Sequence, residues 1–220
     1  MCRRYAEAVL ASIAALLLAA CGSAPPAPDK AEKAASKQEA PADQAAATVP
    51  TEAPVPPEAV QQFDQAVVHM SAGDNTAAER EFRALATTYP TYSGPLLNLG
   101  ILQVKAGRLE DAAQSLSGAV ERNAGNAQAF NQLGIVYRKL GRFKDADSAY
   151  QKAVQIDPNY AIAYLNLGVL CDLYLQQPQR ALEAYERYLA LAGAPDEKVS
   201  GWVTELKKRL GSEPRSARAQ

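Results

Sequence analysis

The sequence has 220 residues, 23 of them basic and 24 acidic, and a formal net charge of −1. A nearly neutral chain lacks the basic surface that nucleic-acid binding requires, so we expect no nucleic acid among its partners. With one histidine and three cysteines the chain is too poor in nitrogen and sulfur ligands for a multi-histidine or multi-cysteine site, and we expect neither a metal nor another cofactor.

Residues 1–20 have the features of an export signal. Two arginines precede an apolar run over residues 8–18, which is shorter than the roughly 20 residues that a membrane-spanning helix needs. The run ends in a Leu-Ala-Ala-Cys box at residues 18–21, which resembles the cleavage site of bacterial lipoproteins. That resemblance implies that Cys21 becomes the lipidated first residue of the mature chain. The alternative is ordinary secretory cleavage after Ala20.

The residue after this cysteine indicates which of the two bacterial membranes would hold the lipoprotein. In Gram-negative lipoproteins an aspartate next to the lipidated cysteine is the usual signal for retention in the inner membrane, and this chain has Gly22 there. The resemblance therefore implies an outer-membrane lipoprotein of the bacterial cell envelope that faces the periplasm. Removal of residues 1–20 takes away two arginines and one glutamate, which changes the net charge to −2.

Residues 21–57 predict a disordered tether that begins with the lipidated cysteine. The segment is rich in alanine and proline, and Val49 and Val55 are its only larger aliphatic residues. Such a composition cannot bury enough apolar surface to offset the conformational entropy of folding.

A repeat of 34 residues begins near residue 59. Gly100, Gly134 and Gly168 each follow an apolar segment and are separated by this step. The same step separates the members of three further series: Gly73, Gly107 and Gly141; Ala78, Ala112 and Ala146; Phe82, Leu116 and Tyr150. A fixed period of this length indicates an array of units, each too small to bury its own apolar face.

Each unit is predicted to be a helical hairpin, as residues 127–160 show most clearly. Apolar residues at positions i, i+3, i+4 and i+7 define one face of a first helix, which Gly141 ends. A second helix ends before Pro158, because the residue before a proline avoids the α region. Gly134 and Ala146 are expected to face each other where the two helices cross.

This hairpin resembles the tetratricopeptide repeat, whose characteristic residues appear in order as Phe130, Leu133, Gly134, Tyr137, Gly141, Ala146, Tyr150, Ala153 and Pro158. The resemblance implies an all-α fold, a right-handed α-solenoid of four tetratricopeptide helical hairpins plus a C-terminal capping helix. The domain is expected over 58–210, with repeats at 59–92, 93–126, 127–160 and 161–194, the capping helix at 196–210 and a flexible tail at 211–220. One residue is inserted in the fourth repeat, where Pro178 is expected to begin the second helix.

No arrangement of residues typical of catalysis stands out. The single histidine, His69, occupies the position of Gln103, Tyr137 and Cys171 in the other repeats and is expected to lie in the core. Carboxylates cluster near the starts of second helices, where they stabilise the helix dipole. We therefore expect no enzyme activity.

The resemblance also implies a binding surface, because first helices line a concave groove in this family. The predicted groove residues are Phe63, Val67, Leu97, Asn98, Ile101, Val104, Asn131, Ile135, Arg138, Leu165, Asn166 and Val169. Most of them are apolar, and the asparagines could bind the backbone of a peptide. The Lys, Arg and Asn residues with which some family members hold a peptide carboxylate are absent from the corresponding positions. Alternatively, Ile101, Ile135 and Val169 mainly pack repeat against repeat.

These features predict a non-catalytic protein–protein interaction scaffold. It would be held in the envelope by a lipid anchor and would bind a peptide or helix of an envelope protein, as a pilotin-like escort or an assembly adaptor. Two alternatives stay open: an accessory of energised outer-membrane transport, and a small-ligand-binding or enzymatic protein with an unrecognised site.

Overall fold

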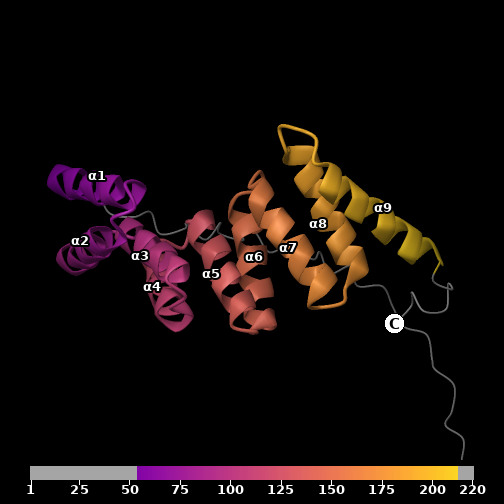
Figure 1. Ribbon diagram of the computed structural model, residues 1–220, viewed down its shortest axis with the longest axis horizontal. Coiled ribbons are helices and arrows are strands. Elements are labelled where there is room, and N and C mark those ends of the chain that lie inside the picture. Colours follow the sequence, from indigo (N-terminus) through magenta and orange to yellow (C-terminus); the bar gives the residue numbers. More distant parts are fainter. Residues whose placement is uncertain (1–53, 213–220) are drawn as a thin grey trace, which may run out of the picture. The chain divides into compact units, whose positions relative to one another are not determined.

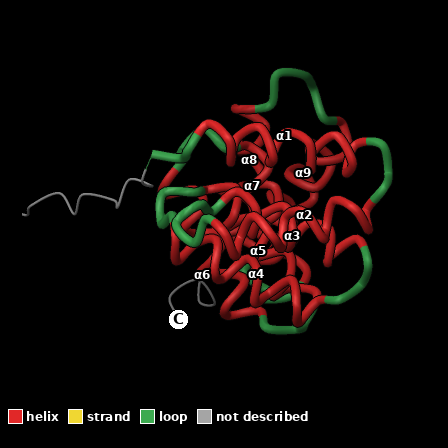
Figure 2. The backbone as a smooth tube through the Cα atoms, turned by 90° about the vertical axis from the view of Figure 1, so that its left-hand side faces the viewer, coloured by secondary structure: helices red, strands yellow, loops and turns green. Residues whose placement is uncertain are grey.

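The computed structural model describes residues 54–212, so the predicted leader, Cys21 and nearly all of the tether lie outside the described residues. Within this range the chain forms nine helices and no strands (Figures 1 and 2). The predicted all-α solenoid is thereby confirmed. The helices are α1 (Pro57–Ser71), α2 (Asn75–Thr88), α3 (Gly94–Lys105), α4 (Leu109–Arg122), α5 (Ala127–Lys139), α6 (Phe143–Ile156), α7 (Ala161–Leu173), α8 (Pro178–Leu191) and α9 (Glu197–Ser212).

Successive helices pack in pairs, and each pair packs against the next. The helices α1 to α8 form four hairpins, and α9 covers α8 (Figure 1). Among the first helices of the hairpins, α3 also contacts α5 and α5 contacts α7, whereas the described second helices α4, α6 and α8 make no comparable contact with one another. The stack therefore bends toward α3, α5 and α7. We call the side formed by these three helices, with the adjoining residue 174, the groove face.

The glycine in each of the first three hairpin turns has a conformation that other residues avoid. Gly73, Gly107 and Gly141 have φ angles of 82°, 76° and 75°. In each turn the next amide bonds back to a carbonyl in the last turn of the helix, as from Arg142 N to Tyr137 O at 2.8 Å. This is the Schellman closure, and it explains why the glycines recur with the repeat.

The fourth hairpin makes the same kind of turn without glycine. Its extra residue shifts the left-handed position to Gln176, which has a φ of 54° and an exposed side chain. The amide of Gln177 then bonds to the carbonyl of Cys171 at 2.9 Å, and Pro178 opens α8 as the sequence predicts. A non-glycine residue in this conformation is strained by roughly 1–2 kcal/mol.

Replacement of Gln176 by glycine is expected to increase the free energy of unfolding by about 0.5–1 kcal/mol. The gain is smaller than the strain relieved, because glycine also has more conformational freedom to lose on folding. Urea denaturation measures the effect. The reverse change at an equivalent turn, Gly141→Gln, should instead destabilise the chain, and equal signs for the two variants would contradict this explanation.

The constant 34-residue spacing of Gly100, Gly134 and Gly168 reflects a close helix crossing in each hairpin. A Cβ atom on Gly134 would lie 2.6 Å from two ring carbons of Tyr150. The corresponding neighbours of Gly100 and Gly168 are Leu116 and Tyr185. The side chain nearest to Gly134 is therefore the ring of Tyr150, one turn further along α6 than the Ala146 that the sequence suggests.

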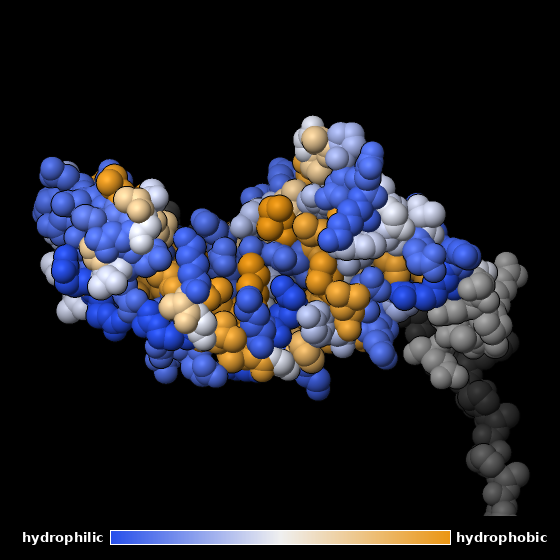
Figure 3. All heavy atoms as spheres, in the orientation of Figure 1, coloured by the Kyte–Doolittle hydropathy of each residue, from blue (hydrophilic) through white to orange (hydrophobic). Residues whose placement is uncertain are grey.

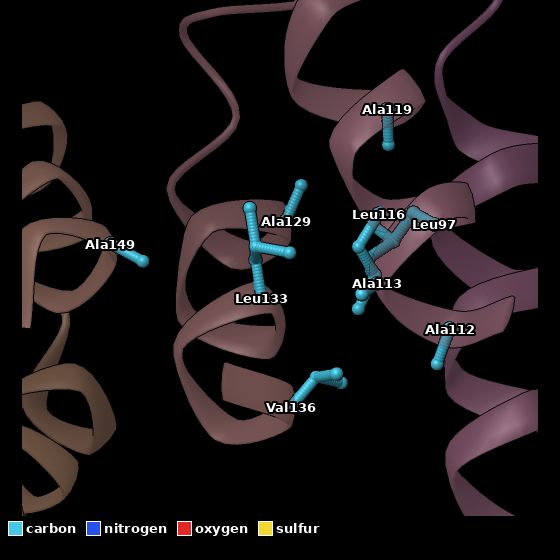
Figure 4. Close-up of a cluster of buried hydrophobic side chains, with 9 residues drawn as sticks. All are labelled: Leu97, Ala112, Ala113, Leu116, Ala119, Ala129, Leu133, Val136 and Ala149. Atoms are coloured by element: carbon cyan, nitrogen blue, oxygen red, sulfur yellow. The ribbon is translucent and has the colours of Figure 1, made fainter. Parts of the chain in front are cut away.

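The central core cluster spans two hairpins (Figure 4). Leu97 of α3 lies against Leu116 of α4, both below 10% exposure, and Ala129, Leu133 and Val136 of α5 pack on the same cluster. Since one cluster contains residues from α3, α4, α5 and α6, neither hairpin could bury this surface alone.

Ion pairs also join neighbouring hairpins. Glu79 of α2 accepts hydrogen bonds from both terminal nitrogens of Arg108, and Asp147 of α6 pairs with Arg180 of α8 at 2.7 Å. The bond from Arg108 lowers the pKa of the Glu79 carboxyl. A lowered carboxyl pKa stabilises the folded state above the ordinary pKa of glutamate, and this contribution is lost as the pH falls through the folded-state value.

The capping helix packs on the last hairpin through aromatic and charged contacts. Trp202 lies 5.3 Å from Tyr185 between ring centroids, and Arg209 pairs with Asp172 of α7 at 2.9 Å. The helix includes residues 211 and 212, which the sequence analysis assigned to the tail, just as α1 includes residue 57 of the predicted tether. No helix in the described range has the length and apolar character needed to cross a bilayer.

The expectation for His69 is wrong. Its side chain is 35% exposed, and its ring nitrogens lie 3.9 Å from an oxygen of Asp74 and 3.6 Å from an oxygen of Glu81. Of the equivalent residues, Gln103 and Cys171 are buried and Tyr137 is half-buried. Cys171 packs in the C-terminal cluster with residues of α8 and α9.

Candidate functional site

The predicted groove residues do not all reach the surface. Phe63 and Val67 of α1 pack on the core of the first hairpin, with Phe63 5.4 Å from Phe82 and 5.3 Å from Tyr92 between ring centroids. Leu97 is 7% exposed and Asn131 is 1% exposed. Leu97 and Asn131 therefore offer little surface to a partner, whereas Phe63 and Val67 are half-buried.

The three predicted asparagines are engaged within the chain. Asn166 donates to the side-chain oxygen of Asn131 at 2.9 Å, and Asn131 donates to the hydroxyl of Tyr160 at 3.4 Å. Asn98 donates to the carbonyl of Gly94 on its own helix at 3.2 Å. Each of the three amides thus donates one hydrogen bond within the chain. Asn131 is buried as well, whereas Asn98 and Asn166 are half-buried and each has a second N–H.

The aliphatic residues of the groove face have a double role. Ile101 and Val104 pack in part on the central cluster, Ile135 packs on the cluster around Tyr150, and Leu165 and Val169 pack on the C-terminal cluster. All five keep some exposed surface. Each of these side chains is therefore buried in part by packing between repeats, and the rest of it is exposed on the groove face.

The most exposed apolar residues of this face lie on α7 and just after it, and the sequence analysis did not assign them to the groove. Ile162, Leu173 and Tyr174 are 48%, 67% and 41% exposed. Hydrophobic side chains also gather in patches over the middle helices of the surface in Figure 3. The spacing could have revealed two of these residues, because Ile162 lies four residues before Asn166 and Leu173 lies four residues after Val169, which continues the predicted stripe in both directions.

The hydrogen bond between Asn166 and Asn131 fixes the orientation of this stripe. Asn166 lies in the middle of it, between Ile162 and Leu173, and reaches toward α5. The buried residues Gly168 and Cys171 lie on the opposite side of the helix. Ile162 and Leu173 therefore lie on the groove face.

Arg138 supplies the charge at one end of this face. One terminal nitrogen lies 3.5 Å from the hydroxyl of Tyr174, and the guanidinium carbon is 5.7 Å from the centre of that ring. Its Nε atom and the hydroxyl of Tyr150 are both buried without a hydrogen-bond partner. Burial lowers the pKa of Arg138, but the hydroxyls of Tyr150 and Tyr174 outweigh this and raise it. The guanidinium is therefore charged at every physiological pH.

The described residues contain no cluster that could hold a metal ion. Cys171 is a free thiol with 0% exposure, and burial raises its pKa to about 11. The thiolate, which is the nucleophile and the metal ligand, is thus scarce at neutral pH. This environment is that of a core residue.

We expect Cys171 to resist alkylation in the folded protein. At pH 8, iodoacetamide should label the peptide that contains Cys171 at least tenfold more slowly than in urea, because the folded-state thiol is both buried and protonated. Mass spectrometry of that peptide separates it from the other two cysteines. Because its pKa is raised, the thiol stabilises the fold fully below about pH 9, and the contribution is lost as the pH rises toward 11. Equal labelling rates with and without urea would contradict the buried position.

Two family profiles described as tetratricopeptide repeat match the sequence, one over residues 69–133 and one over residues 125–194. No curated protein matches it significantly.

Solved structures give a similar result. The crystal structure of MamA is 25% identical, with a TM-score of 0.60 over 66% of this chain and 84% of MamA. The pilF protein of Pseudomonas aeruginosa is 19% identical, with a TM-score of 0.61 over 69% of both chains. A tetratricopeptide repeat protein of Parabacteroides merdae is 19% identical, with a TM-score of 0.58 over 69% of this chain and 60% of its own. The paired helices, the two profile matches and these structures agree: the chain belongs to the tetratricopeptide repeat proteins.

Proposed function

We propose that this protein is a non-catalytic scaffold, lipid-anchored in the cell envelope, that binds a peptide or helix of an envelope protein on its groove face. Its role is that of a pilotin-like escort or an assembly adaptor. Tetratricopeptide repeats generally mediate protein–protein interaction. The observation that carries the proposal for this chain is the exposed apolar stripe that ends in Leu173 and Tyr174.

Burial of the exposed apolar side chains can supply enough free energy to bind a peptide or helix. A partner that covers three or four large apolar side chains gains about 1.5–3 kcal/mol for each before the costs of association are subtracted. The remaining free energy is compatible with micromolar affinity. The partly buried aliphatic residues add area next to Leu173, and they are already ordered by packing between repeats, so little entropy is lost when a partner covers them.

The anchoring half of the proposal depends on Cys21 and the segment that follows it. A lipidated cysteine followed by an alanine- and proline-rich stretch would let the helical domain work at a distance from the membrane. Fractionation of cells that express the wild type or Cys21→Ser tests this half by itself. The substituted protein should leave the membrane fraction, and an unchanged distribution would overturn the anchor.

Site-specific photo-crosslinking in intact cells tests the binding half. A photoreactive residue at position 173 should yield a defined crosslinked species. The same residue at position 152, which is exposed on the second helix α6, should not. The species formed at position 173 should also disappear when Ile135→Asp is introduced, since a carboxylate would be placed on the apolar face. Equal crosslinking from both positions would overturn the groove as the binding surface.

A further inference from the structure

The charge balance of the groove face is strongly uneven. Among the residues of α3, α5 and α7 the cations are Lys105, Arg138 and Lys139, whereas Asp172 is the only acidic residue. That carboxylate is engaged by Arg209 of α9 at 2.9 Å. The three helices that line the face therefore carry an excess of positive charge with no free carboxylate, although the whole chain is nearly neutral.

Arg138 differs from the other arginines of residues 54–212. Each of the others is within ion-pair distance of a carboxylate, as with Arg142 and Asp145 at 2.7 Å, or donates to a backbone carbonyl, as Arg187 does to Pro158 at 3.1 Å. Arg138 has only neutral hydroxyls beside it: that of Tyr174 at 3.5 Å, the long limit of a hydrogen bond, and that of Tyr150, which also raises the pKa of the guanidinium. Its Nε donor is buried without a hydrogen-bond partner in the described chain.

The surroundings of this cation would strengthen its attraction for an anion. Arg138 is half-buried, Ile135 lies one turn before it on α5, and the highly exposed Leu173 adjoins Tyr174. A partner that covers these apolar side chains removes water from the guanidinium, and electrostatic attraction increases as the local dielectric constant falls. A carboxylate can then replace the long Tyr174 contact with shorter, charge-assisted hydrogen bonds.

We propose that Arg138, held by Tyr174, recognises an aspartate or glutamate side chain of the partner, and that this acidic residue is flanked in the partner by bulky apolar residues that cover Leu173 and Ile135. The inference rests on the proposed function, because it names the chemistry of the segment that the groove face binds. A basic or uncharged segment would leave the guanidinium buried without a counter-charge, which is costly.

Selection from a library of random 12-residue peptides tests the inference with the full-length protein. The wild type should enrich peptides that carry an acidic residue beside leucine, isoleucine or phenylalanine. Arg138→Glu should reverse the preference and enrich lysine or arginine beside the same apolar residues. Lys152→Glu makes the same charge change on the exposed face of α6 and should select the wild-type peptides.

Affinities of one selected peptide and its variant with the acidic residue changed to lysine make the test quantitative. The acidic peptide should bind Arg138→Glu at least tenfold more weakly than the wild type, whereas the lysine variant should bind Arg138→Glu better than the wild type does. The neutral variant Arg138→Gln should show neither preference. Circular dichroism and melting temperature check the fold, and Arg138→Gln provides the test if the glutamate variant does not fold.

The outcomes separate the inference from the proposed function. In one outcome the selected peptides bind Leu173→Asp more weakly than the wild type, but the wild type and Arg138→Gln show the same preference for peptide charge. That outcome would overturn the inference that the partner carries an acidic residue and would leave the groove face as the binding surface. Selection of peptides that are indifferent to Leu173→Asp would overturn both. Loss of affinity with both substitutions, together with charge reversal in Arg138→Glu, supports both.

Discussion

Replacement of Tyr150 by alanine is expected to lower the free energy of unfolding by about 3–5 kcal/mol, the loss typical of a large buried aromatic side chain. The side chain is 0% exposed and fills the crossing between α5 and α6, where its ring lies against Gly134. It also belongs to a cluster with Ala146 and Leu170, so the cavity would open between the third and fourth hairpins. Urea denaturation followed by circular dichroism measures the loss.

Tyr174→Ala is the matched control for this prediction. The same atoms are removed, but Tyr174 is 41% exposed. Its ring centroid lies 4.8 Å from that of Phe143 and 5.7 Å from the guanidinium carbon of Arg138. The expected loss is about 1 kcal/mol, in keeping with the aromatic contact and partial burial. Comparable losses for Tyr150→Ala and Tyr174→Ala would show that the α5–α6 crossing is not packed as described.

Replacement of Gly134 by leucine is expected to lower the free energy of unfolding by about 1–3 kcal/mol, because the new side chain overpacks the same crossing. Even the first added carbon would lie 2.6 Å from two ring carbons of Tyr150, and that ring is enclosed on all sides. The strain must exceed the roughly 1 kcal/mol that any residue with a good helix propensity gains over glycine inside a helix. An unchanged or higher stability would contradict the close approach.

Gly201→Ala isolates that gain in helix propensity. Gly201 lies within α9, is exposed, and has no atom within 4 Å of the position that a Cβ would take. We expect this variant to be more stable than the wild type by roughly 0.8–1 kcal/mol. The double variant of Tyr150→Ala and Gly134→Leu adds a further test: since the leucine enters space that the ring leaves, its loss should be smaller than the sum of the two single losses.

The structural features that spacing predicts correctly are those set by forces within one repeat. The hairpins, the turn at Gly141 and the start of α8 at Pro178 all follow from spacing and from backbone preferences, which depend on neighbours a few residues away. The nearest neighbour of Gly134 did not follow from spacing. The 34-residue period indicates that Ala146 and Tyr150 are both inward, but not that the ring of Tyr150 lies nearest to the glycine.

The groove was harder to predict because its composition depends on how one hairpin lies on the next. Asn131 and Asn166 lie in different repeats, and only the packing of α5 on α7 brings them to 2.9 Å and buries Asn131. Leu97 and Leu173 both belong to first helices, yet one is 7% and the other 67% exposed. Leu97 is covered by the hairpin that follows, whereas Leu173 lies at the end of α7.

The amino-acid sequence by itself determined the repeat, its paired helices and the excess of apolar residues on the first helices, because periodicity and turn preferences are local properties of the chain. The tertiary structure alone decided which of those residues remain exposed and which charges find partners. Arg138 is one of many arginines in the sequence. It has no carboxylate partner because Asp172, the only acidic residue of α5 and α7, pairs with Arg209, and because Tyr174 supplies a neutral hydroxyl instead. Contacts between distant residues set the charge and the exposed surface of this face.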